Sequence, residues 1–130
     1  MQQSSKTSRT MAWILVVPIT VFLLLAGGTK IAGANPLETI PGMSDWVFLI
    51  GLGEVTAALL FAVPRTSIIG ALALSAHLGG AILFHIIRDE NFIGPILTSF
   101  WFQSCMLASV WIVVVLRYPA ILENFESRRE

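Results

Sequence analysis

The chain consists of four long apolar stretches, separated by three polar segments and flanked by a polar tail at each end. The stretches cover about residues 12–29, 46–63, 67–87 and 96–116. Each is close to the roughly 17 to 25 residues that a helix needs to cross the hydrocarbon of a membrane. None alternates apolar and polar residues as a membrane strand does, and backbone polar groups in lipid must be satisfied within the segment. The pattern therefore predicts an all-α protein with four transmembrane helices.

The connections between the stretches predict how the helices are arranged. The link from Pro64 to Ser67 is so short that the second and third helices should form an antiparallel hairpin. The first connection, residues 30–45, contains two prolines and is expected to be irregular or to lie on the membrane surface, with Ser44 capping the second helix. Residues 11–119 are thus expected to form one up-down antiparallel bundle, between a mobile polar tail at 1–10 and a charged tail at 120–130.

The lysines and arginines predict the orientation of this bundle. Six of the eight, at positions 6, 9, 65, 117, 128 and 129, fall on one side, and only Lys30 and Arg88 fall on the other. Because cytoplasmic segments carry the excess of positive charge, both termini are expected in the cytoplasm. An alternative interpretation is that the first stretch is a secretory signal peptide, since basic residues precede it and Ala32 to Ala34 resemble a cleavage site. The apolar run continues to Gly28, which is long for a signal core, so we interpret it as a transmembrane helix.

Composition agrees with a membrane protein and excludes other classes. The chain is 55% hydrophobic and 12% charged, whereas a soluble domain has about 25% charged residues. With zero net charge and no long basic tract, it lacks the electrostatic signature of nucleic-acid binding. Its single cysteine, Cys105, excludes an intrachain disulfide and a cysteine-rich metal site, and is expected to be a small buried residue.

Glu54 is the most unusual residue, because it lies in the middle of the second apolar stretch. An ionisable side chain in lipid costs several kcal/mol unless it is paired, protonated or facing a cavity. At about 1.5 Å per residue, Glu54 lies roughly 12 Å below the outer end of its helix, and His77 and Gln103 lie at similar depths in the third and fourth helices. Lys30 and His85 lie nearer the outer surface. These five residues are the candidates for a polar pocket.

Structural explanations for the polar residues compete with functional ones. Thr20 and Cys105 fall at a depth similar to that of Glu54. For Thr20, Gln103 and the serines of the helices, we favour a structural role through interhelical hydrogen bonds, each contributing about 0.6 kcal/mol. Glu54 and His77 differ because they can change protonation, so that together they could hold a proton, a cation or a polar headgroup. No metal is expected: the spacing predicts no zinc site, and two histidines about 12 Å apart along one helix cannot both bind one haem iron.

Small residues predict where helices come close. Ala76 and Gly80 have the spacing that lets two helix backbones approach, and Gly51 and Gly53 give the second helix a comparable surface. The second and third helices are therefore expected to be in direct contact.

Several short motifs, taken in order, resemble the DoxX-like family of small four-helix membrane proteins. They are Phe22-Leu-Leu-Leu-Ala-Gly-Gly-Thr-Lys30, Gly51-Leu-Gly-Glu54, Pro64-Arg-Thr66, His77-Leu-Gly-Gly-Ala-Ile-Leu-Phe-His85 and Leu116-Arg-Tyr-Pro119. The resemblance implies an integral protein of the bacterial cytoplasmic (inner) membrane. The namesakes of the family are linked to a subunit of a thiosulfate:quinone oxidoreductase and to membrane redox assemblies, whereas most members have no assigned activity.

The resemblance also bears on individual residues. It supports a role in the site for Lys30, Glu54 and His85. It also implies roles in the turn and in packing for a second set, Arg65, Gly79 and Gly80. Many relatives carry tyrosine at the position of His77, so the resemblance does not support a catalytic role for His77.

Three hypotheses about function follow. The leading one is a small subunit or accessory of a membrane redox or stress-response system, with a quinone or lipid bound in a pocket lined by the five candidates, and with no catalytic motif of its own. The second is a small proton-coupled transporter, and the third is a membrane chaperone or assembly factor in which the polar layer only fixes helix register. The expected partners are the lipid bilayer and either another protein or a second copy of the chain. A single cavity shared by Glu54, His77 and Gln103 would favour the first two hypotheses.

Overall fold

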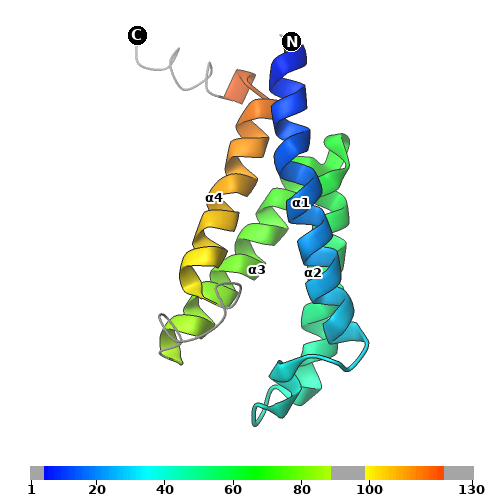
Figure 1. The fold of residues 1–130 in the computed structure, drawn as a ribbon, viewed down its shortest axis with the longest axis vertical. Coiled ribbons are helices and arrows are strands. Elements are labelled where there is room, and N and C mark those ends of the chain that lie inside the picture. The colour runs from blue at the N-terminus through cyan, green and yellow to red at the C-terminus, as the bar shows by residue number, and fades with distance from the viewer. Residues whose placement is uncertain (1–4, 89–98, 122–130) are drawn as a thin grey trace.

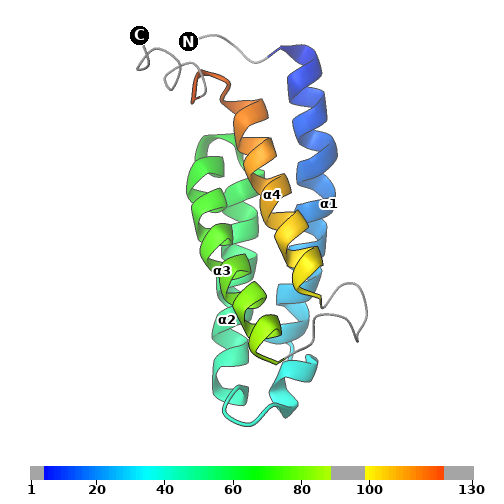
Figure 2. The ribbon, with the colours of Figure 1, turned by 90° about the vertical axis from the view of Figure 1, so that its left-hand side faces the viewer.

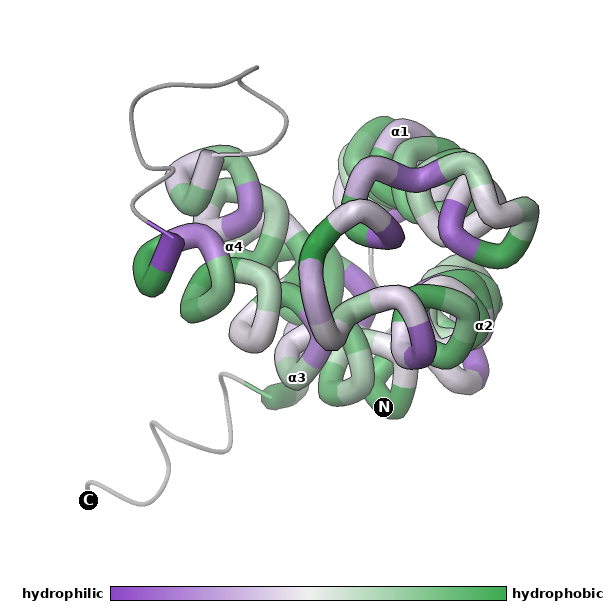
Figure 3. Tube along the Cα trace, turned by 90° about the horizontal axis from the view of Figure 1, so that it is seen from below, coloured by the Kyte–Doolittle hydropathy of each residue, from purple (hydrophilic) through white to green (hydrophobic). Residues whose placement is uncertain are grey.

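The computed structural model describes residues 5–88 and 99–121, which form four α-helices and two short 3-10 helices (Figure 1). The elements are α1 (Lys6–Ile31), η1 (Pro36–Thr39), α2 (Ser44–Ala62), η2 (Pro64–Thr66), α3 (Ser67–Ile87) and α4 (Phe100–Arg117). Each α-helix is long and apolar enough to cross a membrane. Seen from one end in Figure 3, hydrophobic positions occur along all four. The prediction of an all-α protein with four membrane-spanning helices is confirmed.

The first helix begins earlier than the sequence pattern indicated. Ser5 caps α1 by accepting a hydrogen bond from the backbone N–H of Ser8 at 3.1 Å, so residues 6–10 are helical and do not form a mobile tail. The hydroxyl of Ser8 donates a second bond, of 2.7 Å, to the carbonyl of Leu116. The first turns of α1 are therefore attached to the end of α4.

Two other helix ends also differ from expectation. Ser44 is the first residue of α2, and the capping position is Met43, which makes no side-chain capping bond. Helix α4 begins at Phe100, where Ser99 caps it by accepting from the backbone N–H of Phe102 at 3.4 Å. The expected start at residue 96, and the charged tail beyond residue 121, lie outside the described residues.

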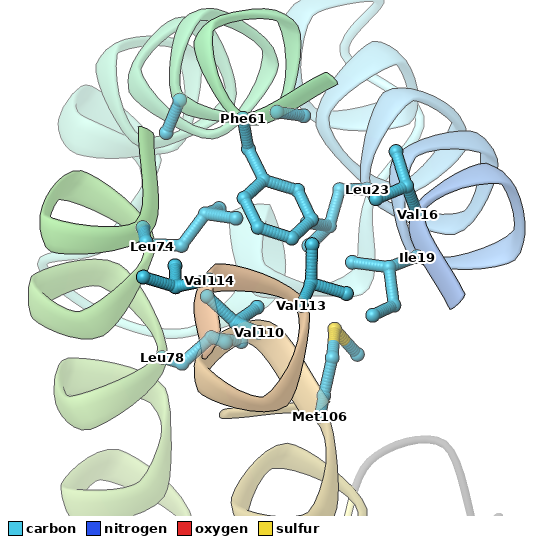
Figure 4. Packing of buried hydrophobic residues seen from close by; sticks show 13 residues of the cluster. Val16, Ile19, Leu23, Phe61, Leu74, Leu78, Met106, Val110, Val113 and Val114 are labelled. Atoms are coloured by element: carbon cyan, nitrogen blue, oxygen red, sulfur yellow. The ribbon is translucent and has the colours of Figure 1, made fainter. Parts of the chain in front are cut away.

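The apolar core lies toward the end of the bundle that holds the start of α1 and the end of α4 (Figures 1 and 2). Phe61 of α2 is fully buried at its centre, facing side chains from the other helices (Figure 4). The cluster comprises Val16, Ile19, Leu23, Ala57, Ala58, Phe61, Ala71, Leu74, Leu78, Met106, Val110, Val113 and Val114. Away from this core, the α1–α2 pair and the α3–α4 pair diverge (Figure 1).

The end of α2 is closed by side chains from the far end of the sequence. The last carbonyl groups of a helix have no partner within it. Arg117 donates to the carbonyl oxygens of Phe61 and Ala62, at 2.8 and 3.2 Å, and the hydroxyl of Tyr118 donates to the carbonyl of Pro64. The motifs around Pro64 and Arg117, far apart in sequence, are thus in direct contact.

Gly51 of α2 lies in close contact with the backbone of α1. A Cβ atom at Gly51 would lie only 2.7 Å from the carbonyl oxygen of Gly27 and 2.7 Å from the Cβ of Lys30. By contrast, a Cβ at Gly79 or Gly80 would meet nothing within 4 Å in the part of the chain that the structure describes. Among residues 5–88 and 99–121, neither glycine lies against a neighbouring helix, so the packing role implied for them stays a prediction.

The expected contact between the second and third helices is made at a different glycine. Gly70 of α3 lies against the backbone of Phe61 so closely that a side chain there would collide with it. Trp111 of α4 also donates to the hydroxyl of Ser75 in α3, at 3.0 Å. Ser75 is thus one of the polar residues that does link two helices.

Candidate ligand-binding cavity

A cavity of about 620 Å³ lies among the four α-helices. Its walls are formed by Phe22, Ala26, Thr29 and Lys30 of α1, Asn35, Leu37 and Met43 of the first connection, Ile50 and Glu54 of α2, Ala76, His77, Gly80, Ala81, Phe84 and His85 of α3, and Gln103 of α4. All five residues proposed for a polar pocket are among them. Sites for small molecules usually measure roughly 300 to 1,000 Å³, and this volume falls within that range.

Glu54 is buried and forms an ion pair with Lys30. Only 3% of Glu54 is exposed, and its Oε2 atom lies 2.5 Å from the ammonium group of Lys30. That ammonium group also lies 3.5 Å from the carbonyl oxygen of Ala26, one helical turn earlier in α1. A buried carboxylate is stable in such a place only when it is paired and hydrogen-bonded, and Lys30 satisfies this requirement.

His77 contacts the other oxygen of the same carboxylate. Its Nε2 atom lies 3.5 Å from Oε1 of Glu54, so α1, α2 and α3 each contribute one member of a three-residue cluster. The sequence pointed to a contact between Glu54 and His77 but placed Lys30 nearer the outer surface. The lysine reaches the carboxylate because α1 and α2 are in close contact at Gly27 and Gly51, and because its side chain is long.

The cavity face of α3 follows helical spacing. His77, Gly80, Ala81, Phe84 and His85 recur at intervals of three or four residues and therefore share one face of the helix. Since no described residue lies within 4 Å of a Cβ at Gly80, the glycine leaves part of the cavity open. Gly79 does not line the cavity, although it too has free space around it.

Aromatic rings form part of the walls. Phe22 of α1 packs edge-on against Phe102 of α4 with ring centres 5.1 Å apart, and Phe84 packs against His85 at 5.7 Å. Gln103 is the only cavity residue from α4 among those described. The lining thus combines apolar and aromatic walls with a few polar groups, as is typical of small-molecule sites.

Two residues expected at the same depth do not reach the cavity. Thr20 is buried, and its hydroxyl has no hydrogen-bond partner within the described part of the chain. Cys105 is exposed, so the expectation that it is buried is wrong. It follows Gln103 by two residues and therefore points about 200° away around α4. Arg65, expected to act in the turn, lies in η2 with an exposed side chain.

Neither a metal-binding cluster among the described residues nor a match to a known protein was found. Within residues 5–88 and 99–121, no group of three or more histidine, cysteine, aspartate or glutamate side chains could hold a metal ion. Comparison of the chain with protein-family models, curated proteins and solved structures found no match in any of the three.

Proposed function

We propose that the chain is a DoxX-like protein of the bacterial cytoplasmic membrane that binds an amphipathic ligand, a quinone or a lipid, in this cavity. In this proposal it is an up-down antiparallel bundle with both termini in the cytoplasm, and it serves as a small subunit or accessory of a membrane redox or stress-response system. The observation that carries the proposal is the convergence of Lys30, Glu54, His77, His85 and Gln103 from four helices on one cavity of about 620 Å³.

A purely structural polar layer would not need this space. Polar groups that only fix helix register pair across a tight contact, as Trp111 and Ser75 do in this bundle. Beside Glu54, in contrast, the small residues Ala76, Gly80 and Ala81 line an open cavity. Open space beside paired polar groups favours a ligand site over the assembly-factor hypothesis.

The chemistry of the walls suits a ring that carries oxygen atoms. The ammonium group of Lys30 donates to Glu54 and to the carbonyl of Ala26, and its third N–H can donate to a carbonyl oxygen of the ligand. Phe22 and Phe84 provide aromatic surfaces against which a flat ring can pack. We expect the chain to bind and orient the ligand while a partner protein supplies the redox centre.

A second candidate function, a proton-coupled transporter, is favoured by the contact between Glu54 and His77. These two groups could pass a proton between α2 and α3. Flux that depends on pH in vesicles containing the purified protein would support this candidate. Flux that is the same at every pH would exclude it.

The proposed ligand site can be tested by filling the cavity. Gly80→Leu should block binding of a short-chain quinone or a lipid, because the new side chain enters the cavity. Gly79→Leu is the matched control, since it adds the same volume to the neighbouring position of the same helix without lining the cavity. Titration of both variants in detergent should show loss of binding only for Gly80→Leu. Equal binding by the two variants would contradict the proposal.

A further inference from the structure

One internal ion pair balances the charge of the cavity lining that the structure describes. Lys30 and Glu54 are the only lysine, arginine, aspartate or glutamate among the described lining residues. Their formal charges, +1 and −1, sum to zero. Both side chains are largely shielded, with 11% of Lys30 and 4% of Glu54 exposed.

The charges of Lys30 and Glu54 already neutralise each other. The ammonium and carboxylate groups lie 2.5 Å apart, and the second carboxylate oxygen faces His77. An anionic headgroup near Lys30 would have to compete with Glu54 and would lie beside its negative charge. A cationic headgroup would face the same conflict with Lys30. Either ion would also lose its hydration on entering an apolar cavity.

We infer that the cavity selects ligands with an uncharged, oxygen-bearing headgroup and rejects anionic amphiphiles. The inference rests on the proposed function and specifies the ligand class. A quinone and a neutral lipid such as a diacylglycerol share this chemistry, because both carry oxygens that accept hydrogen bonds and an apolar chain. Phospholipids with a net negative charge and free fatty acids do not.

The ion pair then determines specificity, and each of its members can be removed separately. Glu54→Gln leaves Lys30 without its counter-charge, which should make the cavity attractive to anions. The double substitution Lys30→Gln with Glu54→Gln removes both charges and restores neutrality. These two variants differ by one side chain, so they separate the effect of charge from the loss of the glutamate.

The test measures binding of three probes to the purified protein in an uncharged detergent: a short-chain quinone, a short-chain diacylglycerol and an alkyl carboxylate. The wild-type chain should bind at least one neutral probe about tenfold or more tightly than the carboxylate, since an unpaired charge in the cavity is costly. Glu54→Gln should reverse this preference, and the double variant should restore it. The quinone and diacylglycerol arms show which neutral ligand is preferred.

The outcomes are distinguishable. Binding of the carboxylate as tightly as both neutral probes by the wild-type chain would overturn the inference while leaving the proposed function intact. Binding of no probe would instead overturn the proposed function. An unchanged preference in a folded Glu54→Gln variant would also overturn the inference, and if that variant does not fold, the preference of the wild-type chain decides.

Discussion

Lys30, in the last turn of α1, reaches into the bundle and places its ammonium group 2.5 Å from a carboxylate oxygen of Glu54 in α2. The pair lies beside a close contact of the two helices, at Gly27 and Gly51, and it forms part of the cavity wall. One contact thus both joins α1 to α2 and sets the charge of the candidate site.

Removing only one member of this pair should destabilise the fold. Lys30→Met leaves the buried carboxylate uncompensated, and breaking a buried ion pair in this way costs about 3 to 5 kcal/mol. Lys30→Met combined with Glu54→Gln should be more stable than Lys30→Met alone, because no unpaired charge remains. Unfolding in mixed detergent measures both free energies. A double variant less stable than the single one would contradict this account of the pair.

Gly51 should be intolerant of a methyl group. Gly51→Ala places a Cβ 2.7 Å from the backbone of Gly27 and from Lys30, so we expect a loss of about 1 to 3 kcal/mol in the free energy of unfolding. Gly53→Ala is the control, because it lies in the same helix with nothing within 4 Å. Thermal unfolding of both variants compares them. Similar stabilities would show that α1 and α2 are not in close contact at this point.

Arg117 should contribute to stability where Arg65 does not. Arg117→Ala leaves the carbonyl groups of Phe61 and Ala62 without their charged donor, at a cost of about 1.5 to 3 kcal/mol. Arg65 is exposed, so Arg65→Ala should change stability by less than about 0.5 kcal/mol. Denaturation of both variants gives the comparison. A larger loss for Arg65→Ala would reverse these assignments.

The orientation proposed from the distribution of positive charge can be checked by labelling in cells. In a Cys105→Ala background, Ser5→Cys should react only with a reagent that reaches the cytoplasm. Thr39→Cys, in the exposed part of η1, should react with an impermeant reagent from outside. Labelling of Ser5→Cys from outside would show the opposite orientation.

The sequence predicted the depth of polar residues better than their direction. The lengths of the apolar stretches and a fixed rise per residue were enough to predict that Glu54, His77 and Gln103 lie at one depth. In the structure all three line one cavity. Depth does not fix how each helix is rotated about its axis. Cys105 was therefore expected to be buried although it faces outward, two residues from Gln103.

The contacts that the sequence did not predict are made between residues that are far apart in the sequence. The sequence placed Arg117 in a family motif and in the charge count, but it did not predict the carbonyl partners of this residue, because these become available only when α4 packs beside the end of α2. In the same way, the glycine at position 80 indicated helix packing, whereas in the structure it leaves space for the cavity. A small residue is compatible with both roles, and the position of the neighbouring helix decides between them.

The most direct test of the central claim is to identify what the protein carries when it is purified from its membrane. Mass spectrometry of organic extracts should find a neutral amphiphile retained by the wild-type chain and by Gly79→Leu, and absent from Gly80→Leu. Retention of the same compound by Gly80→Leu would show that the ligand does not occupy the cavity beside Glu54, and it would contradict the account.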